Sequence, residues 1–268
     1  MEELNNNSNK KIKPLKKFGQ NYLHDQNILS KIAEVIQPQS EDTIVEIGPG
    51  KGALTSKLFD KANSYFAVEI DSRVIEDLKI NFPNITVVNE DFLNIDLNKF
   101  YLNNNRFRAV GNIPYNITSP ILFKLLESRS IVKDVVLLVQ LEVAQRIVAK
   151  SGTKDYGILS VILNTFADVK LCFKISPNVF YPRPKVYSAV IKLDFKEDEI
   201  NFNESLFIKT VKAAFNQRRK TLRNSLGNSI FAELINEDCP INLNLRAEQL
   251  TIKDFIDLTN YIEQKRDL

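Results

Sequence analysis

Apolar and polar positions alternate between residues 25 and 195 in a way that predicts strands and helices in turn. Short β-branched runs that end at glycine, asparagine or an acid predict strands, and apolar residues three and four positions apart predict helices. The predicted strands are 43–47, 64–70, 85–89, 106–110 and 134–139, and the predicted helices are 25–36, 53–61, 74–81, 120–127 and 142–149. This alternation predicts an α/β domain built on a parallel, doubly wound sheet.

The pattern changes towards the C-terminus. Residues 169–175 and 187–195 predict a final antiparallel pair of strands, joined across the proline-rich stretch 177–184. A charged linker follows at 196–199, and the later apolar spacing predicts helices at 204–215, 218–226, 230–236, 247–250 and 252–265. We therefore expect a disordered basic tail over 1–13, an α/β domain over 14–200 and a small helical domain over 201–268.

Composition narrows the classes of protein that remain. The chain is 44% apolar, which supports a packed core, and it has neither an apolar run of membrane length nor a signal-peptide pattern. Cys172 and Cys239 lack metal-ligand spacing and fit a reducing cytoplasm. His24 is the single histidine, so histidine triads, zinc sites and histidine general bases are nearly excluded. We expect a cytoplasmic protein that uses no metal and no membrane.

Charge is distributed unevenly along the chain. Residues 41–99 contain six Lys/Arg and eleven Asp/Glu, a net charge of −5, so the remainder of a chain of net charge +3 carries +8. In two clusters all of the charged residues are basic. They are Lys10, Lys11, Lys13, Lys16 and Lys17 at the start, and Lys212, Arg218, Arg219, Lys220 and Arg223 near the end. Such clusters are often solvated surface, but two of them on a chain with an acidic segment favour a polyanionic partner.

A glycine-rich loop joins the first predicted strand to the next helix, with the sequence Glu46-Ile47-Gly48-Pro49-Gly50-Lys51-Gly52. Glycines there let the backbone approach a nicotinamide dinucleotide, a flavin or S-adenosylmethionine. The G-x-G-x-G spacing, and the acid Glu46 before it, favour S-adenosylmethionine, which carries an ammonium and a sulfonium. Glu69, at the end of the second strand, would bind the ribose hydroxyls, although it also fits a helix cap. Asp91, after the third strand, would accept the adenine amine, although alone it also fits a turn.

The segment Asn112-Ile113-Pro114-Tyr115 follows the fourth predicted strand, where ligands bind in open α/β sheets. The Asn112 amide oxygen and the nearby carbonyls are acceptors, and Tyr115 offers a flat face for stacking on a base. Acceptors that bond the N–H groups of an exocyclic base amine would turn its lone pair towards an incoming methyl carbon. Taken alone, the tetrapeptide reads more simply as an Asn-Pro turn. Its position after the glycine loop, Glu69 and Asp91 favours a methylation site.

With these motifs the chain resembles the bacterial small-subunit (16S) ribosomal RNA adenine N6,N6-dimethyltransferases, from Phe18 to about Leu258. The resemblance is carried by the segments 18–23 (FGQNYL), 46–52 (EIGPGKG), 69–71 (EID), 89–92 (NEDF), 112–117 (NIPYNI), 180–186 (FYPRPKV) and 214–226 (AFNQRRKTLRNSL). The last of these separates the family from relatives that methylate large-subunit RNA. The family often has His or Phe where this chain has Asn21 and Tyr22.

The resemblance implies a Rossmann-like S-adenosylmethionine-dependent methyltransferase domain followed by a small all-helical domain that recognises RNA. It implies cofactor contacts by Asn21, Leu23, Gly48, Glu69, Asp91 and Asn112. It implies that Asn112 and Pro114 lie around the target amine, and that Tyr115 and Phe180 stack on the target adenine. Of the adjacent aromatics Phe180 and Tyr181, we expect Phe180 to be the functional one. We expect RNA contacts from Lys16, Lys17, Arg183, Lys185, Arg218, Arg219, Lys220 and Arg223.

The implied reaction is repeated, direct transfer of methyl to N6 of two adjacent adenosines near the 3′ end of 16S RNA. The partner would be an assembling 30S subunit, with a role in its biogenesis, and the protein would act as a monomer. Two other interpretations stay open. One is an N6-dimethyltransferase of 23S RNA, and the other is a ribosome-assembly or RNA-binding factor of the same fold without catalysis.

Overall fold

The computed structural model describes residues 19–197 and 200–266. These described residues form two compact units, of which the first contains 19–141 and 172–192. The second contains 142–171, 193–197 and 200–266. This division differs from the expected boundary at about residue 200, because residues 142–171 group with the C-terminal helices. The basic tail expected over 1–13 lies outside the described residues.

A seven-stranded sheet has the order β4-β3-β2-β5-β6-β9-β7. Its strands are β2 (Thr43–Ile47), β3 (Ser64–Val68), β4 (Thr86–Val88), β5 (Phe107–Asn112), β6 (Val132–Gln140), β7 (Ala167–Ile175) and β9 (Ser188–Phe195). The pairs β2–β3, β3–β4, β2–β5 and β5–β6 are parallel. The chain runs outward from β2 to β4 and returns to β5, so the strand order reverses between β2 and β5. The predicted α/β class is confirmed.

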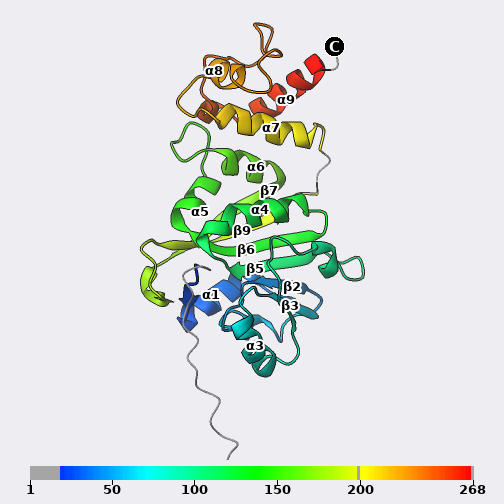
Figure 1. The fold of residues 1–268 in the computed structure, drawn as a ribbon, viewed down its shortest axis with the longest axis vertical. Coiled ribbons are helices and arrows are strands. Elements are labelled where there is room, and N and C mark those ends of the chain that lie inside the picture. The colour runs from blue at the N-terminus through cyan, green and yellow to red at the C-terminus, as the bar shows by residue number, and fades with distance from the viewer. Residues whose placement is uncertain (1–18, 198–199, 267–268) are drawn as a thin grey trace, which may run out of the picture. The chain divides into compact units, whose positions relative to one another are not determined.

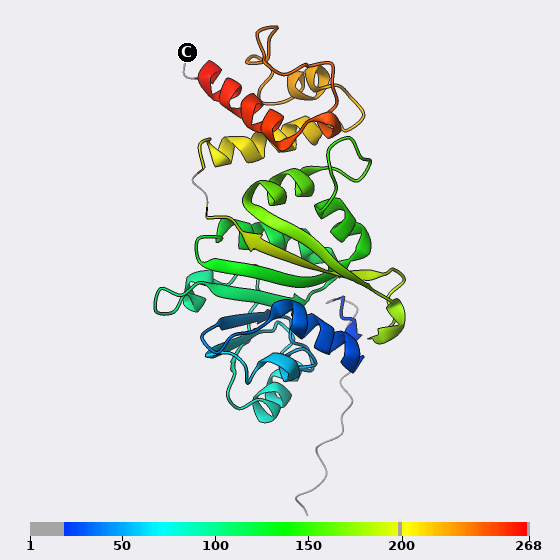
Figure 2. The same cartoon turned by 180° about the vertical axis from the view of Figure 1, so that it is seen from behind.

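Helices of the first unit cover both faces of its sheet. Figure 1 shows α4 (Thr118–Glu127) in front of the strands, and Figure 2, turned by 180°, shows α1 (Gln26–Ile36) in front of them. The Asp25 side chain caps α1 by accepting from the N–H groups of Asn27 and Ile28. The short helices α2 (Thr55–Leu58) and α3 (Ile75–Asn81) follow β2 and β3, and α5 (Leu141–Ile147), which belongs to the second unit from Glu142 on, follows β6. All of these lie within predicted helices or extend them slightly.

The core beneath α1 shows the alternation expected of strands with buried faces. Val136 and Leu138 of β6, two positions apart, pack with Val110 of β5 and with Leu29 and Ile32 of α1. This packing against α1 fixes the positions of β5 and β6 in the sheet. The functional site is built at the carboxyl ends of the central strands.

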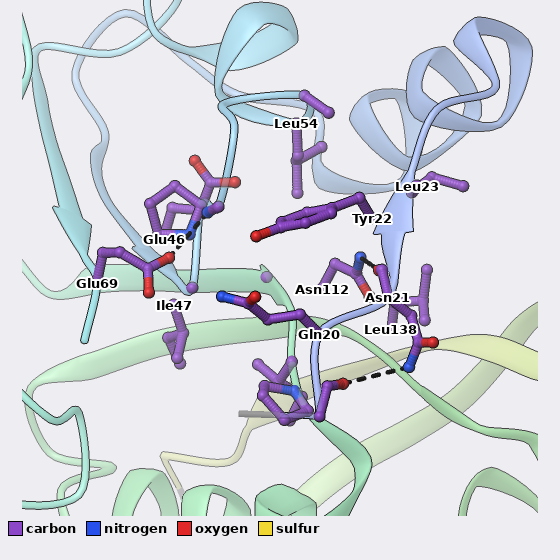
Figure 3. Close-up of a pocket in the computed structure, with 18 of the residues that line it drawn as sticks. Gln20, Asn21, Tyr22, Leu23, Glu46, Ile47, Leu54, Glu69, Asn112 and Leu138 are labelled. Atoms are coloured by element: carbon purple, nitrogen blue, oxygen red, sulfur yellow. Dashed lines mark hydrogen bonds between the residues drawn. The ribbon is translucent and has the colours of Figure 1, made fainter. Parts of the chain in front are cut away.

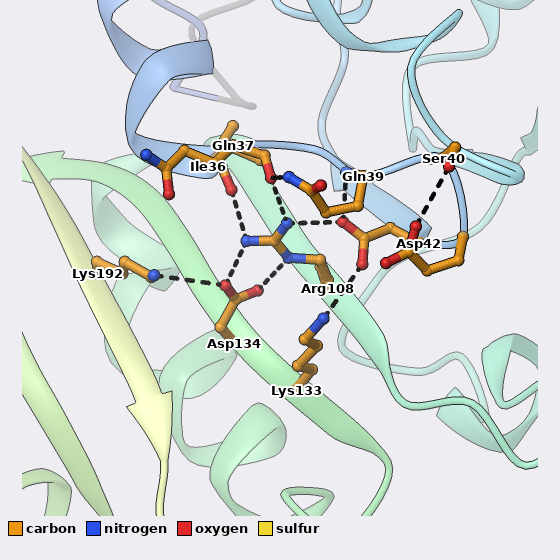
Figure 4. Close-up of polar contacts among 10 residues, drawn as sticks. Ile36, Gln37, Gln39, Ser40, Asp42, Arg108, Lys133, Asp134 and Lys192 are labelled. Carbon is orange, nitrogen blue, oxygen red and sulfur yellow. Dashed lines mark hydrogen bonds and ion pairs between the residues drawn. The ribbon is translucent and has the colours of Figure 1, made fainter.

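A buried ion-pair network ties α1 to the sheet (Figure 4). The Arg108 guanidinium on β5 donates to the Asp134 carboxylate on β6, at 2.5 and 2.8 Å, and to Asp42 at 2.7 Å. It also donates to the carbonyls of Ile36 and Gln37 at the end of α1. Arg108 therefore satisfies the last turn of α1 and neutralises two buried acids. The contact lowers the pKa of Asp42 against the opposing effect of burial.

The second unit contains α6 (Ile158–Phe166), α7 (Glu204–Phe215), α8 (Leu222–Gly227) and α9 (Ile252–Arg266). The rings of Phe215 and Phe255 stack between α7 and α9 at 5.8 Å. The expected helix 218–226 begins only at Leu222, because its first N–H groups donate to the carbonyls of residues 243 and 245. The expected helix 230–236 is a series of turns. In the described ranges, no helix is both long and apolar enough to cross a bilayer.

Candidate functional site

A cavity of about 600 Å³ lies in the first unit, at the carboxyl ends of β2, β3 and β5. This is the reversal point of the strand order, where open α/β sheets bind their ligands. The volume is in the range of small-molecule sites. Of the predicted site residues, the cavity wall includes Asn21, Leu23, Gly48, Glu69, Asp91, Asn112, Pro114 and Tyr115. Figure 3 shows several of them converging from different elements.

The glycine loop turns directly beneath the cavity. Gly48 and Gly50 have φ angles of +67° and +56°, in the left-handed region that side chains disfavour. The Gly48 N–H continues the β2–β3 pairing by donating to the Val68 carbonyl, and the Gly50 N–H donates to Glu69 Oε2 at 2.9 Å. A β-carbon on Gly50 would lie 2.8 Å from the Tyr22 ring, so this position has no room for a side chain.

Glu69 is fixed rigidly at the end of β3. Its Oε2 accepts from Gly50 N–H and its Oε1 from Asp71 N–H at 2.8 Å, and the side chain is buried. Burial raises the pKa of Glu69 against the lowering effect of these hydrogen bonds. Each oxygen has used one acceptor site, so one site on each remains for a ligand. Two acceptors at this spacing suit the two hydroxyls of a ribose.

Glu46 lines the cavity, but its carboxylate already accepts hydrogen bonds from two hydroxyl groups. Its Oε2 accepts from Thr55 Oγ1 at 2.5 Å and from Tyr65 OH at 2.7 Å. Burial raises its pKa to about 7, against the lowering effect of these two hydroxyls. Near neutral pH Glu46 is thus only partly charged. The structure shows it chiefly as an anchor for α2 and β3.

The third strand supplies the next wall. Asp91 lines the cavity, and one of its carboxylate oxygens accepts from Leu93 N–H at 2.9 Å, which leaves acceptor capacity on the other oxygen. Phe92 lines the cavity beside it. The Asn89 side chain donates to the Glu69 carbonyl at 2.7 Å and so couples the ends of β4 and β3.

Asn112 forms the last residue of β5 and reaches the cavity because β5 approaches β2 closely. A β-carbon on Gly111 would lie 2.5 Å from the Ile47 carbonyl oxygen, so only glycine permits this approach. The Asn112 amide nitrogen donates to the Asn21 carbonyl at 2.9 Å. That bond orients the amide, because the nitrogen is taken by Asn21 and the oxygen is left as an acceptor (Figure 3).

Pro114 and Tyr115 continue the wall beyond Asn112. The Tyr115 hydroxyl shares a hydrogen bond of 2.7 Å with Ser188 Oγ at the start of β9, which fixes the ring. Burial raises the pKa of Tyr115. The phenol is therefore neutral and presents a ring face rather than a charge.

Phe180 and Tyr181 form the short strand β8 (Phe180–Tyr181), which pairs antiparallel with β1 (Tyr22–Leu23). Phe180 packs in the hydrophobic core and is 3% exposed, whereas Tyr181 lines the cavity and is 66% exposed. The expectation that Phe180 rather than Tyr181 faces the site thus differs from the structure. Successive side chains of a strand point to opposite sides, and the β1–β8 register turns Phe180 inward.

Sequence reasoning overlooked two further residues of the wall, Gln20 and Tyr22. The Gln20 amide donates to Asp71 Oδ2 at 3.0 Å, and Figure 3 shows it reaching into the cavity between Tyr22 and Glu69. Burial raises the pKa of Tyr22 to about 12, and the charges of Asp71 and Glu69 add to this effect. In the sequence, only the position of Gln20 and Tyr22 on either side of Asn21 in the 18–23 motif indicated that they could line the site. Three or more His, Cys, Asp or Glu do not gather as a metal-binding group anywhere in the described chain.

The predicted RNA-contact residues fall in different settings. Arg183 and Lys185 are exposed on the segment after β8. Arg218 holds its own unit together, since it donates to the carbonyls of Lys154 and Tyr156 and pairs with Glu248 at 3.5 Å. Arg223 pairs with Glu237 at 2.9 Å, while Arg219 and Lys220 are exposed. Lys16 and Lys17 lie outside the described residues.

Comparison with known proteins adds to this geometry. The family model described as "Ribosomal RNA adenine dimethylase" matches residues 10–264. Two proteins named "Ribosomal RNA small subunit methyltransferase A" are similar to the chain. The one from Flavobacterium johnsoniae is 43% identical, covering 94% of this chain and 97% of the relative. The one from Chlorobium phaeobacteroides is 44% identical, covering 91% of each.

Two solved structures resemble the fold over almost the whole chain. A dimethyladenosine transferase from Plasmodium falciparum has a TM-score of 0.79 at 28% identity, covering 91% of this chain and 98% of that one. The 23S rRNA methyltransferase ErmE has a TM-score of 0.68 at 26% identity, covering 91% of this chain and all of the other.

Proposed function

The chain belongs to the ribosomal RNA adenine dimethylase family, and we propose that it dimethylates N6 of two adjacent adenosines near the 3′ end of 16S RNA. The methyl donor in this proposal is S-adenosylmethionine. One observation carries it: a fixed carboxylate suited to a ribose, Glu69, and an oriented amide acceptor, Asn112, line the same cavity.

The residues of the cavity fit this donor. Glu69 keeps one acceptor site on each oxygen for the ribose hydroxyls, and Asp91 keeps an oxygen for the adenine amine. Gly48 offers its backbone beneath the cavity without a side chain, and Asn21 and Leu23 cover it from above. When bound, S-adenosylmethionine supplies a methyl group on a sulfonium, which is already a good leaving group. The protein is therefore required to align and desolvate rather than to act as an acid or base.

The residues from Asn112 to Pro114 prepare the acceptor amine. Its lone pair is delocalised into the adenine ring, so the amine is a weak nucleophile. The oxygen of Asn112 and a nearby backbone carbonyl accept its two N–H groups and turn the lone pair out of the ring plane. The same acceptors stabilise the positive charge that develops on nitrogen. The Asn21 carbonyl keeps the amide from flipping, because a flipped Asn112 would set two oxygens face to face.

Tyr115 holds the target base during transfer. A base must leave its stack to enter the cavity, and stacking on the Tyr115 ring offsets that loss. The hydrogen bond to Ser188 keeps the ring in place before the base arrives. Stacking of Phe180 on the same base stays a prediction, and in the structure its ring packs in the hydrophobic core.

We assign the small ribosomal subunit during its assembly as the partner, with the protein acting as a cytoplasmic monomer. All six predicted residues from Arg183 to Arg223 are exposed, and Arg183, Lys185, Arg219 and Lys220 are our candidates for phosphate contacts. Arg218 and Arg223 take part in pairs within their own unit, so we assign them to holding that unit in shape.

The test is methyl transfer to ribosomal subunits isolated from cells that lack the gene. With labelled S-adenosylmethionine, the purified protein should label small-subunit RNA, and digestion should yield N6,N6-dimethyladenosine. Large subunits from the same cells are the matched control. Label in the large subunit alone would favour the 23S activity, and a protein that binds subunits without transferring label would favour a non-catalytic factor.

A further inference from the structure

The segment 181–187, here called the rim loop, joins two points on the acceptor end of the cavity. At its start Tyr181 lines the cavity and pairs with Tyr22 across the β1–β8 ribbon. At its end Tyr187 precedes Ser188, whose hydroxyl bonds to that of Tyr115, and the Tyr187 carbonyl accepts from Leu141 N–H at 2.9 Å. The rim loop is thus anchored at both ends beside the place where the target base would enter.

The rim loop exposes large apolar side chains that add little to the core. Tyr181, Val186 and Tyr187 are 66%, 43% and 56% exposed. Only six residues in the described chain are large, apolar and exposed to this degree, and three of them lie in these seven positions. Exposed apolar groups gathered beside a cavity indicate a surface that binds another molecule.

The charge around the rim loop indicates the kind of molecule. Residues 172–192 contain four Lys/Arg and no Asp or Glu. Two of the four, Arg183 and Lys185, are exposed on the rim loop between the two tyrosines. Aromatic rings that alternate with exposed cations provide both stacking faces for bases and contacts for phosphates, and an acidic peptide would not require the rings.

We infer that the rim loop binds the unpaired nucleotides that flank the target adenosine, with Tyr181 and Tyr187 stacking on bases and Arg183 and Lys185 contacting phosphates. This inference rests on the proposed function and adds the requirement that the substrate be single-stranded at this point. Bases within a duplex are already stacked on each other, so they cannot offer free faces to the tyrosines.

The experiment measures binding of an RNA hairpin whose loop carries two adjacent adenosines, by fluorescence anisotropy over a series of salt concentrations. We expect Tyr181→Ala and Tyr187→Ala each to weaken binding about tenfold, as loss of one stacked base does. Tyr181→Phe and Tyr187→Phe should bind like the wild type, because the ring face is kept. A fully paired RNA of the same composition should bind equally to all of these proteins.

Salt dependence separates stacking from charge. The slope of log affinity against log salt should be unchanged in the tyrosine variants and should fall by about one in Lys185→Ala, because only the lysine releases a counterion. Ile80→Ala on α3, which removes an equally exposed apolar side chain away from the cavity wall, is the matched control. Calorimetric binding of S-adenosylhomocysteine by the Tyr187, Lys185 and Ile80 variants should match that of the wild type and shows that the cavity is intact.

Three results would overturn the inference while leaving the proposed function in place. They are equal hairpin binding by wild type and both alanine variants, an equal loss in the phenylalanine variants, and a weakening that extends to the paired RNA. Failure of the wild-type protein to label small subunits would instead overturn the proposed function, whatever the rim loop binds.

Discussion

The nitrogen and the oxygen of the Asn112 amide group have different functions. Its nitrogen is held by the Asn21 carbonyl, and its oxygen is thereby presented to the cavity as an acceptor. Glu69 is used in the same divided way, since each of its oxygens accepts one backbone N–H and keeps one site open. At the residue scale the site is therefore preorganised, because fixed backbone groups orient the Asn112 and Glu69 side chains before any ligand binds.

Replacement of Asn112 by alanine should separate binding from transfer. We expect S-adenosylhomocysteine affinity to stay within about threefold and methyl transfer to fall by about a hundredfold or more, the usual cost of losing one preorganised polar group at the reacting centre. Calorimetry and single-turnover labelling measure the two effects. Asn164→Ala removes a similar side-chain bond, to the Ile147 carbonyl, and should leave transfer unaltered. Unchanged turnover of Asn112→Ala would refute the assigned role.

Glu46 should make the stability of the protein depend on pH. Its pKa is about 7 in the folded protein against 4.5 when exposed, so the folded state keeps a proton that the unfolded state has lost. The stability that the protonated carboxyl contributes to the folded protein is therefore complete below about pH 4.5 and is lost as pH rises through about 7. Glu46→Gln keeps both hydroxyl contacts and should unfold with a free energy higher by on the order of 3 kcal/mol at pH 8 but not at pH 4.5.

Urea unfolding of wild type and Glu46→Gln over this pH range checks the prediction. Glu233→Gln, which removes an exposed acid, controls for the loss of one negative charge. A stability difference for Glu46→Gln that is the same at every pH would show that the carboxyl does not hold its proton in the folded state.

Some site residues were predictable one by one, and others were not. Gly48, Glu69 and Asp91 follow strands, and parallel strands bring their carboxyl ends to one edge, so their meeting in one cavity follows from the pattern. The choice between Phe180 and Tyr181 does not follow. Adjacent residues of a two-residue strand face opposite sides, and only pairing with β1, about 160 residues earlier, determines which ring is buried.

At the scale of elements, the close approach of β5 to β2 determines where Asn112 lies. Gly111→Ala would place a methyl group 2.5 Å from the Ile47 carbonyl oxygen, and backbone cannot give way as a flexible side chain does. We expect a loss of about 1–3 kcal/mol in the free energy of unfolding, together with weaker transfer as Asn112 moves. Gly227→Ala in α8 meets no atom within 4 Å and should be neutral or slightly stabilising. Equal stability of the two variants in urea unfolding would contradict the close approach.

The Arg108 network should be the most costly polar cluster to break. Arg108→Met removes the buried cation of Asp42 and Asp134, which keep only the ion pairs to Lys133 at 3.3 Å and Lys192 at 3.8 Å (Figure 4). It also takes the guanidinium donor from the Ile36 carbonyl at the end of α1. We expect the free energy of unfolding at pH 7 to fall by about 3–5 kcal/mol. Arg146→Met breaks an exposed pair with Glu142 and should change it by less than about 1 kcal/mol. Similar losses in both variants by urea unfolding would refute this distinction.

The elements themselves were predicted unevenly, for identifiable reasons. Helices with a clear apolar face, such as α1, α7 and α9, were found close to their observed bounds. The sequence of α6 is apolar on nearly every side and matches no single-face pattern, so it was missed. The start of α8 is set by the carbonyls of residues 243 and 245, about twenty residues downstream, which no local pattern reveals.

For the whole molecule, the structure divides into two units at other residues than the predicted boundary near 200. Residues 142–171 group with the C-terminal helices because contacts such as Arg218 with Tyr156 join segments about sixty residues apart. The uneven charge is retained in the structure: acids gather around the cavity, and exposed basic residues remain on the rim loop and before α8.

The central claim is that this chain dimethylates adjacent adenosines of small-subunit RNA. Mass-spectrometric mapping of ribosomal RNA from cells lacking the gene, and from the same cells supplied with wild type or Asn112→Ala, tests it most directly. The account predicts that two adjacent N6,N6-dimethyladenosines near the 3′ end of 16S RNA disappear with the gene, return with wild type and stay absent with Asn112→Ala. Unchanged 16S RNA in the cells that lack the gene would contradict it.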